Sequence, residues 1–135
     1  MRVVSTFVLA TAALVATALP ASADVAAAVA LQPQGRLEAR GAAVTAPMRV
    51  MCQNGATGTL WVQITQNVRG ELAIGDKYVP SVPCSGNYEK VSVTVVSRTK
   101  AFRAGVAFTS ALLNVYVPPS DSTVVDEARE MTIVS

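Results

Sequence analysis

The sequence contains no histidine, so the side chain that most often acts as a general base near neutral pH is missing. Neither a Ser-His nor a Cys-His nucleophile pair can form, and the commonest nitrogen ligand of zinc is absent. No glycine-rich phosphate loop followed by Lys-Ser or Lys-Thr occurs either. We therefore expect a protein that is not an enzyme, with no catalytic residue, no cofactor and no metal ion.

Charge is also scarce: charged residues make up 15% of the chain and its formal net charge is +2. The charges are scattered, so neither nucleic acid nor an anionic membrane is an expected partner. The carboxylates do not suggest the facing pair that a glycosidase needs. Asp121, Asp126 and Glu127 match no calcium-binding loop in their spacing, and a solvated loop accounts for them better.

One nominal catalytic motif occurs, because the segment from Ser97 to Lys100 fits the pattern S-x-x-K. In enzymes with this motif, the lysine activates a serine nucleophile at the start of a helix. Here the segment ends a Val/Thr-rich strand pattern, and the partner motifs S-D-N and K-T-G are absent. We interpret the match as chance.

The only long apolar run, residues 3–19, follows Arg2 and leads to the small residues Ala21 and Ala23. This order predicts a signal peptide over residues 1–23, cleaved after Ala23. A transmembrane anchor is the alternative, but the run ends in proline and lacks a flanking positive cluster. The expected product is secreted, extracellular and free of the membrane.

Cys52 and Cys84 are the only cysteines. In an oxidising compartment they most simply form one structural disulfide. The chain-entropy estimate for a loop of about 33 residues is roughly 3.5 kcal/mol of stabilisation.

Residues 24–35 are rich in alanine and glutamine, and we expect them to form a flexible leader. From Arg36 to residue 135, apolar and polar residues alternate with a period of two, which is typical of half-buried strands. About seven strands separated by turn residues predict an all-β domain, an immunoglobulin-like β-sandwich. The longest run of this part of the chain extends from Val106 to Val117. A helix over residues 101–113 is the alternative for it, disfavoured by Gly105 and by Pro118 and Pro119, which end the run.

Trp61, the only tryptophan, shares a face with Gln63 and Thr65 if the alternation is unbroken, opposite the apolar face of the same strand. An outward Trp61 beside amide and hydroxyl groups is typical of a surface that binds sugar or protein. A one-residue bulge would instead turn Trp61 into the core. Both orientations stay open, with a slight preference for the core, and Trp61, Gln63 and Thr65 form the candidate binding surface.

The segments 31–41 (LQPQGRLEARG), 50–66 and 82–95 resemble a set of small secreted actinobacterial proteins without a known activity. The resemblance covers most of the expected mature chain, but its motifs are structural and imply no activity. The broader likeness is to immunoglobulin-like sandwiches. There the sequence departs, because Cys52 and Cys84 are closer in sequence than the usual inter-sheet pair and Trp61 follows the first cysteine too soon.

Three functions are compatible with this pattern. The first is a non-catalytic binding or envelope-associated module, a monomer whose partner is a protein or a cell-envelope glycan. The second is a protease inhibitor that presents the loop from Val79 to Ser85, stiffened by two prolines and Cys84. The third is a carbohydrate-binding module, which the small number of aromatic residues weakens.

Overall fold

The computed structural model describes residues 25–135, in which the regular secondary structure is all β-strand apart from one short 3-10 turn, Ala39–Gly41. The predicted signal peptide, with Ala21 and Ala23 at its cleavage site, lies outside the described residues. The strands in chain order are β1 (Ala27–Leu31), β2 (Gln34–Glu38), β3 (Ala43–Cys52), β4 (Thr57–Val68), β5 (Glu71–Val82), β6 (Glu89–Val96), β7 (Gly105–Val117) and β8 (Asp121–Val134).

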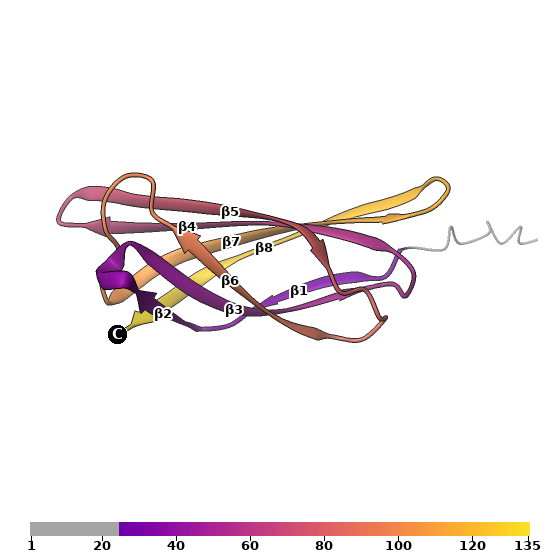
Figure 1. The fold of residues 1–135 in the computed structure, drawn as a ribbon, viewed down its shortest axis with the longest axis horizontal. Coiled ribbons are helices and arrows are strands. Elements are labelled where there is room, and N and C mark those ends of the chain that lie inside the picture. The colour runs from indigo at the N-terminus through magenta and orange to yellow at the C-terminus, as the bar shows by residue number, and fades with distance from the viewer. Residues whose placement is uncertain (1–24) are drawn as a thin grey trace, which may run out of the picture.

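The strands form two layers that face each other across one core (Figure 1). One layer is antiparallel, in the order β8, β7, β4, β5. In the other layer β3 is central, with β6 along one edge and β1 followed by β2 along the other. β2 links the layers because it also pairs in parallel with the end of β8. The prediction of an all-β sandwich with one disulfide is confirmed, with eight strands in the described residues rather than about seven.

The additional strand comes from the segment predicted to be a flexible leader, and that prediction is wrong. Residues 27–31 form β1, which pairs with Met48–Cys52 of β3, and β2 begins at Gln34. The physical reason is a short alternation hidden in the alanine-rich stretch. Val29 and Leu31 point into the core and are buried, so that ordering this segment removes apolar surface from water.

The core is filled by the inward residues of both layers, which are mostly Val, Leu, Ile and Ala. Phe102, from the loop between β6 and β7, is the largest fully buried side chain. Its backbone N–H donates to the carbonyl of Gly41 at 2.8 Å. Gly41 has φ +93°, and a Cβ there would collide with the Phe102 carbonyl, so the close approach of the two segments requires glycine.

The run from Val106 to Val117 forms β7, and the helix considered over residues 101–113 does not form. Residues Pro118–Ser120 turn the chain directly into β8. The hairpin of β7 and β8 extends past the turns of the other strands in the view of Figure 1.

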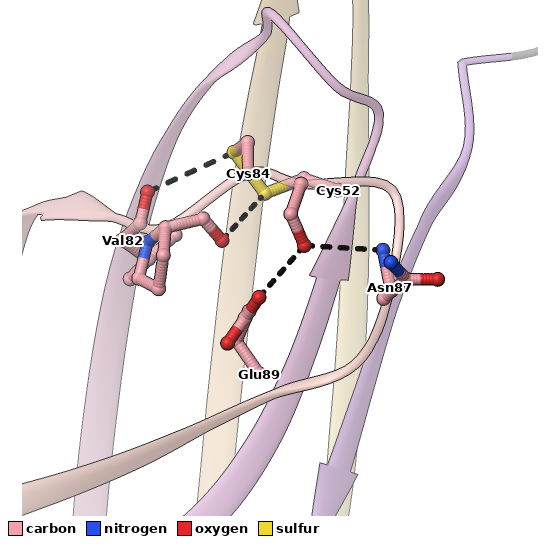
Figure 2. The surroundings of a disulfide bond; sticks show 7 residues. Cys52, Val82, Cys84, Asn87 and Glu89 are labelled. Carbon is pink, nitrogen blue, oxygen red and sulfur yellow. Dashed lines mark hydrogen bonds between the residues drawn. A yellow bond between two sulfur atoms is a disulfide. The ribbon is translucent and has the colours of Figure 1, made fainter.

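The predicted disulfide between Cys52 and Cys84 is present, and it staples one end of the sandwich (Figure 2). Cys52 ends β3 and is fully buried, whereas Cys84 follows the end of β5, so the bond connects the two layers. The Cα atoms are 4.7 Å apart. The short sequence separation suits an inter-layer bond here because the chain crosses to the other layer once, between β3 and β4, and β5 then runs back beside β4 to the same end.

Candidate functional site

The S-x-x-K segment places its serine hydroxyl and its lysine amine on different partners. The Ser97 hydroxyl donates to the backbone carbonyl of Lys100 rather than to its amine. The Lys100 ammonium lies 2.6 Å from Glu71 Oε2 and donates to the carbonyl of Val68 at 3.4 Å. The lysine amine is thus engaged with Glu71 and Val68, and its hydrogen bond lowers the pKa of the Glu71 carboxyl.

The acidic residues of β8 do not converge. Asp126 is exposed on the outer face, whereas the neighbouring Glu127 accepts a hydrogen bond from the Leu31 N–H at 3.4 Å. Across residues 25–135 no three acidic or cysteine side chains are placed to hold one metal ion.

Trp61 lies on the outer face of β4 with 45% of its surface exposed, so the interpretation that placed it in the core is wrong. The bulge that would have turned it inward does not occur in β4, whose inward and outward residues alternate along the whole strand. The register of β4 against β5 does shift near Gly58, but the extra residue belongs to β5, where three steps from Val82 to Val79 match two on β4. The centroid of the Trp61 ring lies 6.3 Å from the ring centroid of Tyr78, which is its cross-strand partner on β5.

Gln63 and Thr65 share this face and are half-buried. Gln63 lies opposite Ser110 of β7, and Thr65 lies opposite Phe108. The three residues of the candidate binding surface are therefore in one row along β4, as the alternation predicted.

The structure adds a much larger apolar surface around this row. Eight of the eleven large apolar side chains that are exposed in the described part of the chain lie on the outer face of β5, β4, β7 and β8. We refer to this surface as the aromatic face. Its members are Trp61, Leu72, Tyr78, Val106, Phe108, Leu112, Tyr116 and Val124.

Charge is confined to the margins of the aromatic face. The two central strands, β4 and β7, contain no charged residue. On the flanking strands, Asp76 pairs with Arg98 at 2.7 Å, and Asp126 and Glu130 line the β8 side.

Sequence reasoning missed the β7 part of this face, although a signal existed. In residues 106–117 both alternating sets are largely apolar, and one set holds Phe108, Leu112 and Tyr116. The smaller set, with Ala107 and Ala111, is the buried one. A strand with two apolar faces is either buried on both sides or exposes one of them, and only the layer order decides which.

The loop proposed for protease inhibition, Val79 to Ser85, is not a protruding loop. Residues up to Val82 belong to β5, where Val82 is buried and pairs with Gly58. The segment that follows is held at Cys84 by the disulfide. The expected exposed loop is therefore absent from Val79 to Val82, because β5 continues to Val82 and places this side chain in the core.

No helix within residues 25–135 combines the length and the hydropathy needed to cross a bilayer. The chain matches no protein-family model, and no curated protein is significantly similar to it. The resemblance to small secreted actinobacterial proteins therefore stays a prediction.

Proposed function

We propose that the protein is an exported, non-catalytic module that binds another protein through its aromatic face. The observation that carries this proposal is the gathering of eight exposed large apolar side chains on one sheet surface. Contiguous exposed apolar patches are uncommon on monomeric proteins and usually mark interaction sites.

The layout of the aromatic face supports a protein partner. Protein interfaces combine an apolar centre, rich in Trp, Tyr and Phe, with a polar rim that carries the charges. Trp61 and Leu112 lie opposite each other at the uncharged centre of the face, while Asp76, Asp126 and Glu130 stand on the flanking strands. The half-buried Gln63 supplies an amide beside Trp61.

A glycan is the weaker candidate for the same surface. Sugars stack on aromatic rings and need many polar partners, and the Trp61–Tyr78 pair with Gln63 provides one such place. Half of the exposed members of the face, however, are Leu or Val, which give no stacking surface. These aliphatic side chains favour an apolar protein surface.

The Cys52–Cys84 bond supports export, because disulfides form and persist in oxidising compartments outside the cytosol. Outside the aromatic face, Arg36 and Glu38 form an ion pair with each other. Arg36 donates to Glu38 at 2.7 Å and this hydrogen bond lowers the pKa of Glu38.

The test uses Trp61 as a unique fluorescent probe. In the free protein its emission should be readily quenched by acrylamide, and a protein partner purified from the culture medium should protect it. Leu112→Ser should weaken that binding at least tenfold, as expected for the centre of an interface. The matched control is Val96→Ser, an exposed aliphatic residue on β6 in the opposite layer.

Equal weakening by Leu112→Ser and Val96→Ser would contradict the assignment of the aromatic face. Protection of Trp61 by polysaccharide alone would replace the protein partner with a glycan. A second copy of the chain is the third occupant to test, by light scattering. A dimer that dissociates in the Leu112→Ser variant would mean that a second copy covers the face.

A further inference from the structure

The outer face of the other layer carries a groove whose shape follows from the path of β1 and β2. β1 pairs with residues 48–52 of β3, and β2 pairs with residues 43–45 on the same edge. This edge of β3 is therefore unpaired at Ala46 and Pro47, between the two strands. Proline has no N–H to offer, which suits an unpaired position.

Two adjoining hollows, of about 430 and 300 Å³, open at this break. They share Gln34, Pro47 and Ser92, and we call them together the notch groove. The larger hollow is bordered by Arg49 and Lys90, and the smaller one reaches Arg36. The notch groove is separate from the aromatic face, which belongs to the other layer.

Arg49 and Lys90 are direct cross-strand partners in the register of β3 and β6, and both are exposed. Like charges directly opposite each other destabilise a sheet. Within residues 25–135 neither side chain forms an ion pair. Two carboxylates of the same layer are engaged elsewhere, since Glu38 accepts from Arg36 and Thr45, and Glu89 accepts from Ser85.

We propose that the notch groove binds a hydroxyl-rich chain that carries anionic groups, phosphate or carboxylate. The anionic group would lie between Arg49 and Lys90, where a guanidinium and an ammonium together provide charge-assisted donors. Gln32, Gln34 and Ser92 line the same hollow, and amide and hydroxyl side chains suit the hydroxyl groups of such a chain. The volume exceeds what one small anion fills and lies in the range of sites for larger ligands.

The unfavourable charge pair supports this assignment. A local arrangement that costs stability without a structural return is commonly kept for function. Replacing Lys90 by glutamate would turn repulsion into attraction with Arg49, and a favourable cross-strand charge pair stabilises a sheet. The substitution should therefore stabilise the fold while it removes the anion site.

The experiment measures binding of the purified protein to three polymers by calorimetry at low and moderate salt. The probes are poly(glycerol phosphate), polygalacturonate and neutral dextran. We expect binding to at least one anionic polymer, weakened by salt, and no binding to dextran. The anionic polymer that binds identifies phosphate or carboxylate as the charged group.

Arg49→Gln and Lys90→Glu should each weaken this binding at least tenfold, and Lys90→Glu should also raise the Tm by about 1–5 °C. The matched control is Lys77→Gln, which removes one exposed charge on β5 in the other layer. Absence of binding to both anionic polymers would overturn the proposal, and so would an equal loss in Lys77→Gln. A lower Tm for Lys90→Glu with unchanged binding by Arg49→Gln would show that the pair is only structural.

Discussion

Removal of the disulfide should cost a large part of the stability of this domain. The double variant Cys52→Ala/Cys84→Ala opens a loop with a sequence separation of 32 residues. The chain-entropy model assigns about 3.5 kcal/mol to such a loop, mainly through the greater freedom of the unfolded chain. With the usual unfolding entropy per residue, the Tm of a domain of this size should fall by roughly 15 °C.

The structure also predicts where the loss is felt first. The disulfide fixes the end of the sandwich at which Gln53 N–H donates to Ala26 O and Gly86 N–H donates to Cys52 O. Amide hydrogen exchange should therefore accelerate at Gln53 and Gly86 before it does in the centre of β4 or β7. This pattern follows because local opening starts where constraints are removed.

Thermal and urea unfolding followed by circular dichroism measure the cost. Ser85→Ala is the control, because it removes only exposed hydrogen bonds next to the disulfide and should change the free energy of unfolding by less than about 0.5 kcal/mol. A loss below about 1 kcal/mol for the double variant would refute the account of the disulfide as the staple between the layers. An even acceleration of exchange across all strands would refute its local part.

Two further predictions concern the edge where β5 meets the segment after β6. Gly75→Ala should lower the free energy of unfolding by about 1–3 kcal/mol, measured by urea unfolding. A Cβ at this position would lie 2.5 Å from the Val96 carbonyl oxygen and would force the two edges apart. An unchanged urea midpoint would show that the bridge between Gly75 and Ser97 is dispensable. Glu71 should make stability fall in acid, because Lys100 lowers its pKa in the folded state. The contribution of Glu71 to stability is complete above the ordinary glutamate pKa and is lost as pH falls through the lowered pKa. Glu71→Gln should therefore flatten this part of the pH–stability curve. A curve identical to that of the parent protein would contradict the role of the ion pair.

The strands of residues 36–135 follow directly from the alternation in the sequence. Regular alternation puts Leu60, Val62 and Ile64 on one side and Trp61 on the other, because successive side chains of a strand point to opposite sides, and only the structure shows that no bulge in β4 interrupts it. The disulfide could also be predicted from the sequence, because two cysteines have only one way to pair within the chain. The candidate row of Trp61, Gln63 and Thr65 came from the same periodicity.

Alternation says which residues share a face but not whether that face is covered, and the remaining features depend on that. The exposure of Phe108 and Tyr116 depends on β7 lying in a layer whose outer side has no covering element among the described strands. The assignment of residues 27–31 to β1 depends on a place beside β3 that exists only when β3 is in position. The opposition of Arg49 and Lys90 is set by the register of β3 and β6, which are far apart in sequence. The sequence by itself therefore determined the strands after residue 36, which residues share a side of each strand, and the disulfide. Only the tertiary structure decided which sides meet water, because burial and charge proximity are properties of segments brought together by folding.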